Sequence, residues 1–227
     1  SEPQSDINRG TSETTGNSTG YARTSLTNPR CIAFGHQYNV SVNGKIKQKY
    51  VMNNPYLLEH LRTIQDFPKP GINFRDVTTL FKDAKCLEIM EEELYELYKD
   101  KGITKVVGLE TRGYIMGAVI ARKLGAGFVM ARKPGKLPAT TIKESYSKEY
   151  GVDSIEMHLD AITSDDVVLI HDDLLATGGT IKAAWKLVNQ LKPKKCYMNF
   201  LIEIRDEGLQ GREFIGDGIE VTTLIQV

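Results

Sequence analysis

Residues 167–180 read VVLIHDDLLATGGT, and this stretch decides the fold. It opens with four aliphatic side chains in a row, which is typical of a parallel strand buried on both faces. Small residues follow, and Ala183, Ala184, Leu187 and Val188 then recur at helical spacing. A strand, a turn and a helix in this order predict an α/β fold of the doubly wound kind, with a mostly parallel sheet flanked by helices.

The turn in this stretch predicts a phosphate site. The start of a helix carries unpaired backbone N–H groups and the positive end of the helix dipole, so it binds anions without any lysine or arginine. Gly178 and Gly179 permit close approach of the ligand, and the hydroxyl groups of Thr177 and Thr180 add donors. We therefore expect a phosphate group at this turn.

Asp172 and Asp173 lie where the strand ends, which is where ligands bind in open α/β sheets. Their carboxylates can accept hydrogen bonds from two adjacent sugar hydroxyls. Diol acceptors beside a phosphate loop predict a ribose phosphate ligand. The alternative is that both acids only begin a turn, with the glycines serving packing.

Strands and helices alternate through most of the chain. Asn54 and Pro55 predict the start of a helix that ends near Phe67–Pro68, and Asp83 predicts the cap of a second helix. On that second helix Leu87, Met90, Leu94 and Leu97 share one face, and Glu91 to Glu93 are expected on a solvated face. Further strands are expected over 105–109, 127–131, 167–170 and 196–204, and further helices over 113–124 and 180–191.

The first 52 residues fall outside this alternation. Residues 1–30 are rich in Ser, Thr, Asn and Gly, with too few apolar side chains to offset the entropy of ordering, and predict a disordered tail. In the extension 31–52, Asn43–Gly44 lies between short alternating stretches and predicts a hairpin. The domain that binds the ligand is then expected over 53–227.

Composition excludes several classes of protein. Lys plus Arg and Asp plus Glu both number 29, so no global positive field attracts nucleic acid or an anionic membrane. The three cysteines form no metal or redox motif, and neither a signal peptide nor a membrane-spanning apolar run is evident. We therefore expect a cytoplasmic protein that binds neither nucleic acid nor membrane.

Several stretches resemble one enzyme family. Residues 172–180 resemble the phosphoribosyl pyrophosphate motif of the type I phosphoribosyltransferases, and the segments 67–76, 109–114, 132–138 and 145–151 resemble the adenine branch. The resemblance covers roughly residues 54 to 227. It implies transfer of a phosphoribosyl group from phosphoribosyl pyrophosphate to adenine, giving AMP and pyrophosphate, with Mg²⁺ bound together with phosphoribosyl pyrophosphate, in a homodimer. Transfer to another purine base, or a regulator that senses phosphoribosyl pyrophosphate, is the alternative.

The same resemblance implies roles for individual residues, with a hood near 67–76, a lid over 132–151 and no side chain as a metal ligand. Ribose phosphate is assigned to Asp172, Asp173, Ala176, Thr177, Gly178, Gly179 and Thr180. Pyrophosphate and lid contacts are assigned to Glu110, Thr111, Arg112, Arg132, Lys133 and Lys136, with a cis peptide bond before Thr111. Adenine is assigned to Ile72, Asn73, Arg75 and Ile204, and catalysis to Arg112, Glu149 and Tyr150.

Some of these assignments leave alternatives open. Glu149 either transfers a proton to or from the purine or only orients it. Arg75 has Asp76 beside it as another partner, and Arg112 also fits a surface arginine before a helix. His171, alone at a strand end, is expected to be structural rather than catalytic.

Overall fold

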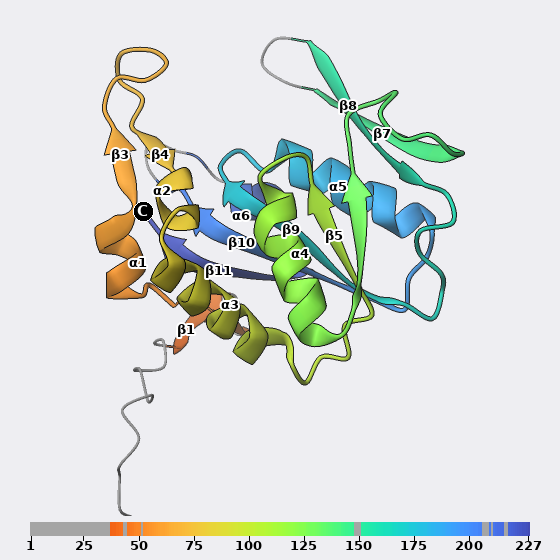
Figure 1. Cartoon of the computed structure of the whole chain (residues 1–227), viewed down its shortest axis with the longest axis horizontal. Coiled ribbons are helices and arrows are strands. Elements are labelled where there is room, and N and C mark those ends of the chain that lie inside the picture. Colours follow the sequence, from red (N-terminus) through yellow and green to blue (C-terminus); the bar gives the residue numbers. More distant parts are fainter. Residues whose placement is uncertain are drawn as a thin grey trace, which may run out of the picture. The chain divides into compact units, whose positions relative to one another are not determined.

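The computed structural model describes residues 37–42, 45–50, 52–147, 151–205, 209, 211–215 and 218–227. Its elements are labelled in Figure 1 where there is room. In chain order they are β1 (Gln37–Val42), β2 (Lys45–Tyr50), α1 (Pro55–His60), β3 (Arg62–Ile64), β4 (Phe74–Asp76), α2 (Thr78–Phe81), α3 (Ala84–Tyr98), β5 (Lys105–Leu109), α4 (Gly113–Leu124), β6 (Gly127–Ala131), β7 (Thr141–Ser147), β8 (Val152–His158), β9 (Val167–Leu175), α5 (Gly179–Gln190), β10 (Lys195–Glu203), α6 (Gly211–Ile215) and β11 (Glu220–Gln226).

A five-stranded sheet forms the centre of the fold. Its strands lie in the order β11-β10-β9-β5-β6, and every neighbouring pair is parallel. The carboxyl ends of parallel strands meet at one edge, so the loops that follow β5, β9 and β10 lie together there. The predicted α/β fold with a parallel sheet is confirmed (Figure 1).

The sheet is buried on both faces. On β9, Leu169 packs into the core that includes α3 and α4, whereas Val168 and Ile170 pack into the core that includes α5. Figure 1 shows α3 and α4 together over the same side of the sheet. Because both faces of β9 are covered, its sequence reads as an unbroken apolar run rather than an alternating one.

The first predicted helix is much shorter than expected. α1 begins after Asn54, whose side chain accepts a hydrogen bond from the N–H of Tyr56, but it ends at His60. β3 then pairs with β4, and Arg62 forms an ion pair with Asp76 at 2.5 Å. Strand pairing and this ion pair outweigh the helical spacing that Leu61 and Ile64 suggest, so the predicted extension of the helix to Phe67 is wrong.

The predicted cap and inner face of α3 hold, but its acidic face differs in part. Asp83 accepts a hydrogen bond from the N–H of Cys86 at 2.8 Å, and Met90 and Leu94 are fully buried. Glu91 and Glu92 lie near Lys123 of α4, which fits an outer face. Glu93 instead accepts a hydrogen bond from Asn54 of the neighbouring segment at 2.7 Å, and burial raises its pKa, so its assignment to the solvated face is wrong.

Antiparallel strand pairs accompany the sheet. Among the described residues, β1 pairs with β2, β3 pairs with β4, and β7 pairs with β8, while the predicted turn at Asn43–Gly44 lies outside the described residues. The β3–β4 pair frames residues 65–73, and the β7–β8 pair begins inside the segment 132–151 and runs past it. The segments that the sequence predicts as a hood and a lid therefore each overlap a strand pair. Among the described residues, no helix has the length and apolar character needed to cross a bilayer.

Candidate active site

Two adjacent carboxylates lie near the carboxyl end of β9. Asp173 is 4% exposed, and its N–H donates a hydrogen bond to Oδ1 of Asp172 at 2.9 Å. The Nε of Arg112, which precedes α4, lies 2.6 Å from Oδ2 of Asp173. Part of the Arg112 side chain stays exposed, but its guanidinium group balances one charge of the pair. This ion pair with a buried acid disfavours the reading of Arg112 as an ordinary surface arginine.

The pKa values of both carboxyl groups are raised. Burial raises the pKa of Asp172 well above its ordinary value, and the neighbouring charge of Asp173 adds to the effect. Burial also raises the pKa of Asp173, but the positive charge of Arg112 opposes the shift. Two acids held in this way are poorly solvated, so they gain much from hydrogen-bond donors or from positive charge brought by a ligand.

A glycine lets α4 approach this pair closely. A Cβ atom on Gly113 would lie 2.9 Å from both Oδ1 of Asp172 and the carbonyl oxygen of His171. Any side chain there would push the start of α4 away from β9 and with it Arg112. The peptide bond between Glu110 and Thr111 is cis, as the resemblance implied.

The phosphate loop joins β9 to α5. Gly178 has a φ of +81°, and a Cβ atom there would lie 2.6 Å from the carbonyl oxygen of Gly211, so only glycine fits. α5 begins directly afterwards, and its first N–H groups lack helical partners. Thr177 is exposed, Ala176, Gly179 and Thr180 are half-buried, and Gly178 is buried. The residues predicted for phosphate therefore lie together around one helix start.

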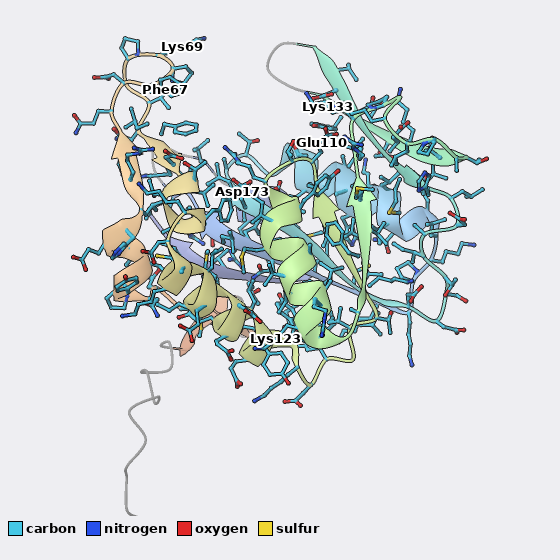
Figure 2. The ribbon with its side chains drawn as sticks, viewed as in Figure 1. Phe67, Lys69, Glu110, Lys123, Lys133 and Asp173 are labelled. Carbon is cyan, nitrogen blue, oxygen red and sulfur yellow. The ribbon has the colours of Figure 1, made fainter. Side chains whose placement is uncertain are left out.

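Glu110 forms hydrogen bonds with the loop that follows β6 and carries Arg132, Lys133 and Lys136. Its carboxylate accepts a hydrogen bond from Nζ of Lys136 at 2.6 Å, from the N–H of Lys133 at 2.9 Å and from Nη2 of Arg132 at 3.3 Å. The hydrogen bond from Lys136 is the largest effect holding the pKa of Glu110 at about 2, and partial burial opposes it. Figure 2 shows Glu110 and Lys133 side by side at the base of the β7–β8 hairpin. Sequence predicted these residues for one subsite but not their pairing with one another.

Sequence reasoning missed Glu156. This buried side chain on β8 accepts a hydrogen bond from the N–H of Gly135 at 2.9 Å and from the hydroxyl group of Thr141 at 3.3 Å. The backbone of Glu156 also exchanges two hydrogen bonds with Arg132. The loop that carries the cations is therefore held between two carboxylates, Glu110 and Glu156. An acid between the apolar residues Ile155 and Met157 was the one signal available in the sequence.

The segment 67–76, predicted as a hood, comprises most of the loop after β3 and the strand β4 itself. The N–H of Phe67 donates to the carbonyl oxygen of Ile72 at 3.1 Å, and the N–H of Gly71 donates to Asp66 at 2.7 Å. Phe67 and Ile72 are 49% and 45% exposed, an unusual exposure for two large apolar side chains in one short loop. Figure 2 shows Phe67 in this loop, together with Lys69.

Two other residues predicted for adenine belong to this hairpin. Asn73 is exposed, and Arg75 donates a hydrogen bond to the hydroxyl group of Thr63 at 2.7 Å. The carboxylate of Asp76 pairs with Arg62 and also accepts from Thr78. The Arg75–Asp76 pair that the sequence left open does not form here.

Ile204 follows β10 at the same edge of the sheet as the acids. It is half-buried, and its N–H donates to the carbonyl oxygen of Leu175, the last residue of β9, at 2.9 Å. This hydrogen bond ties Ile204 to the start of the phosphate loop. Glu149 and Tyr150 lie outside the described residues, between β7 and β8 in the sequence.

His171 precedes the two acids and points into the core. It is fully buried, and its Nδ1 lies 2.9 Å from Oδ1 of Asn199. Burial lowers the pKa of His171 to about 4, so the ring is neutral at pH 7. This environment agrees with the structural role expected from the sequence.

Comparison with known proteins gives consistent matches. A family model described as "Phosphoribosyl transferase domain" matches residues 76–207. The chain is 57% identical over 175 residues to the adenine phosphoribosyltransferase of Bacteroides thetaiotaomicron, covering 77% of this chain and 98% of that protein. It is 52% identical over 157 residues to that of Escherichia coli O1:K1 / APEC, covering 69% and 86%.

Solved structures match the same part of the chain. The adenine phosphoribosyltransferase of Rhodothermus marinus superimposes with a TM-score of 0.71 at 47% identity, covering 76% of this chain and 97% of that chain. The enzyme of Giardia lamblia, solved in complex with 9-deazaadenine, gives a TM-score of 0.72 at 39% identity, covering 78% and 98%.

Proposed function

Because the chain belongs to the adenine phosphoribosyltransferases, within the type I phosphoribosyltransferase family, we propose that the edge of the sheet described above is its active site. The reaction is that of purine salvage, in which the 5-phosphoribosyl group moves from phosphoribosyl pyrophosphate to adenine and leaves AMP and pyrophosphate. One observation carries the assignment of the site. The adjacent acids Asp172, half-buried, and Asp173, buried, lie with Arg112 beside them and shortly precede the helix start at Gly179.

The phosphate loop and the two acids are assigned to different parts of the ribose phosphate. The N–H groups at the start of α5 and the hydroxyl groups of Thr177 and Thr180 bind the 5-phosphate, and Gly178 gives the loop its left-handed turn and its close packing against Gly211. Asp172 and Asp173 accept hydrogen bonds from the ribose hydroxyls. Their raised pKa values are consistent with this, because the donors of the sugar supply the solvation that burial has removed.

The same acids and Arg112 act on the charge that develops at the reacting carbon. Cleavage of the bond to pyrophosphate leaves positive charge on the sugar and negative charge on the leaving group. Carboxylates beside the ring stabilise the sugar, and Arg112 stabilises the departing pyrophosphate. Fixed groups of this kind need no reorganisation at the moment of reaction, and the ion pair of Arg112 with Asp173 fixes them.

The lid cations complete the pyrophosphate subsite. Glu110 lies just before Arg112 in the sequence and forms ion pairs with both Lys136 and Arg132. We assign Glu110 to the positioning of these cations. Glu110, Thr111 and Lys133 are also assigned to the groups that face pyrophosphate. A closed lid also excludes water, which would otherwise attack the same sugar cation.

Magnesium fits this site as an ion carried by the substrate. Among the residues that the structure describes, no group of three or more His, Cys, Asp or Glu side chains is arranged to hold a metal ion. Mg²⁺ commonly binds through substrate phosphates and keeps several of its waters, so no side chain of this chain is assigned as its ligand. Held by phosphoribosyl pyrophosphate, the ion would neutralise charge on the pyrophosphate.

Adenine is assigned to the space between the hood and Ile204. Backbone groups of residues 72–75 offer acceptors for the amino group of adenine, and the exposed side chain of Ile72 offers an apolar surface. Arg75 and Asn73 border this surface, and Ile204 packs on the other side of the base. Glu149 and Tyr150 of the lid are assigned to the purine nitrogens.

The remaining assignments concern the whole protein. We place the catalytic domain at 53–227, with the hood near 67–76 and the lid at 132–151, in a cytoplasmic homodimer. Residues 1–52 stay an extension of undetermined role. The even charge balance argues against a nucleic-acid partner.

Purine selectivity tests the proposed function. Purified protein is incubated with Mg²⁺, phosphoribosyl pyrophosphate and adenine, hypoxanthine, guanine or xanthine, and nucleotide formation is followed by chromatography. Adenine should be used with a far higher kcat/KM, because acceptors built for an amino group stay unpaired with the other bases, at a cost of several kcal/mol. Comparable kcat/KM values for hypoxanthine would favour the reading as a transferase of another purine. Tight binding of phosphoribosyl pyrophosphate without turnover would favour a regulator.

A further inference from the structure

Tyr146 connects the β7–β8 hairpin to the phosphate loop. The hydroxyl group of Thr180, in the first turn of α5, donates a hydrogen bond to the hydroxyl oxygen of Tyr146 at 3.3 Å. Tyr146 in turn donates to Oδ2 of Asp153 at 3.4 Å, across the strand pair. The other oxygen of Asp153 accepts from the N–H of Ser154 at 2.9 Å. A chain of donors thus runs from the phosphate loop into the hairpin.

Among the described residues, polar contacts join the hairpin to α5 at two separated places. At the start of the helix the contact is Tyr146 with Thr180. Near the end of the helix Glu144 lies 3.6 Å from Lys186 and accepts from Gln190 at 3.2 Å. Between them lies a cavity of about 410 Å³, lined by Glu144, Ser145, Tyr146, Val152, Gly179, Lys182, Ala183 and Lys186. Polar contacts therefore join the hairpin to the helix on both sides of this cavity, in addition to the apolar core that the two elements share.

These two contacts differ in strength and in consequence. The contacts of Gln190 and Lys186 are exposed, so water and salt weaken them. Tyr146 is partly buried, and its ring packs with Ile142 against the core beneath α5. Its hydroxyl group also engages a side chain that belongs to the phosphate loop. Of the polar contacts described between the hairpin and α5, the one between Tyr146 and Thr180 involves a residue that we assign to the 5-phosphate.

We propose that Tyr146 is a positioning residue, whose hydroxyl group fixes the Thr180 side chain for the 5-phosphate and ties the β7–β8 hairpin to the loaded phosphate loop. The proposal rests on the assignment of residues 176–180 to that phosphate. Thr180 has a single hydroxyl proton, so on binding it turns this proton from Tyr146 to the phosphate, and its oxygen then accepts a hydrogen bond from the Tyr146 hydroxyl group. A side chain that already has a partner in this place loses less rotational freedom on binding. Since the same bond anchors the hairpin, the 5-phosphate and the hairpin stabilise each other, as linkage requires.

The test compares two ligands in the full chain. Dissociation constants are measured by calorimetry for ribose 5-phosphate and for pyrophosphate, with wild type and with Tyr146→Phe. The ring stays in place in this variant, so its packing is kept and only the hydroxyl group is lost. Ribose 5-phosphate should bind roughly 3- to 10-fold more weakly, as expected for one hydrogen bond, and pyrophosphate should bind unchanged. Equal losses for both ligands, or no loss for either, would overturn the proposal.

Two further variants separate the hydroxyl group from the hairpin as a whole. Gln190→Ala removes the contact at the far end of α5 and should leave both dissociation constants unchanged. If it weakens ribose 5-phosphate as much as Tyr146→Phe does, hairpin docking in general is responsible and the proposal fails. In a Thr180→Val background, Tyr146→Phe should add less than about 2-fold, because its partner is already gone. Additive losses would contradict a role that acts through Thr180.

Hydrogen exchange gives a measurement on the unaltered protein. Ribose 5-phosphate should slow the exchange of backbone N–H groups in β7, and pyrophosphate should slow them less. Equal exchange with and without ribose 5-phosphate would overturn the coupling. If the wild type does not bind ribose 5-phosphate at all, the assigned phosphate loop fails; if it binds and Tyr146→Phe binds equally well, only the role of Tyr146 fails.

Discussion

Asp172 and Asp173 place two carboxylates next to each other, Asp172 half-buried and Asp173 buried. Such an arrangement favours binding of a polar ligand over stability of the ligand-free fold, because burial raises the pKa of both acids and the charge of Asp173 raises that of Asp172 further. Between the ordinary pKa of an aspartate, about 3.9, and the raised value in the fold, the folded state holds more protons than the unfolded chain. Stability is therefore lost as the pH rises through this window.

Asp172→Asn should accordingly be more stable than wild type at pH 7 and less active. We expect its Tm to rise by ~2–4 °C for each kcal/mol gained, with little difference from wild type below about pH 4. Thermal unfolding between pH 4 and 8 measures this, beside kcat/KM for adenine. A variant less stable than wild type at pH 7 would show that the carboxylate contributes to the fold.

Variants at Glu149 and Arg112 distinguish a loss of proton transfer from a loss of charge stabilisation. Glu149→Gln keeps the size of the side chain but cannot exchange a proton, so a general acid or base role predicts a fall in the single-turnover rate of ~10²-fold or more. Arg112→Ala should lower the same rate by a similar ~10²-fold through lost stabilisation of pyrophosphate. If Glu149→Gln stays within about threefold of wild type, Glu149 positions adenine and transfers no proton.

At the scale of elements, one buried acid joins the end of β10 to its neighbours. Glu203 accepts hydrogen bonds from Arg212 of α6 at 2.6 Å and from Gln226 of β11 at 2.8 Å, and Arg205 pairs with it as well. Burial by itself would raise the pKa of Glu203, but these hydrogen bonds and charges outweigh it and hold the pKa at about 2. The network fixes the strand end from which Ile204 extends.

Glu203→Gln should destabilise the fold by about 2–4 kcal/mol at pH 7, because Arg212 loses its charged partner. A lowered pKa contributes stability that is present above about pH 4.3 and lost as the pH falls toward 2. The difference between wild type and variant should therefore shrink in that window. Urea unfolding at pH 7 and at pH 3 tests this, with the exposed Glu96→Gln, whose partner is Lys99, as a control expected within about 0.5 kcal/mol.

At the scale of the whole molecule, the part of the chain that matches its relatives is shorter than the chain. The adenine phosphoribosyltransferase of Bacteroides thetaiotaomicron matches over 98% of its own length while covering 77% of this chain. Deleting residues 1–27, which carry few apolar side chains, should leave kcat/KM within about twofold of the full chain. A soluble truncated protein with tenfold lower kcat/KM would show that this segment contributes to the site or to assembly.

The sequence by itself determined the frame of the fold and the kind of ligand. The run 167–170, the glycines at 178 and 179 and the helical spacing that follows are local signals, because burial on both sides of a strand and the start of a helix each leave a pattern in consecutive residues. The cap of α3 by Asp83 is equally local. The residues assigned to ribose phosphate could therefore be found without coordinates.

Only the tertiary structure decided which side chains meet. Three hydrogen-bonded pairs join residues far apart in the sequence: Glu110 with Lys136, Asn54 with Glu93, and Tyr146 with Thr180. The end of α1 at His60 likewise follows from the pairing of β3 with β4. A sequence pattern reports the local backbone and its burial, whereas the choice among several acids and cations depends on distances and desolvation that exist only after the strands and loops have come together.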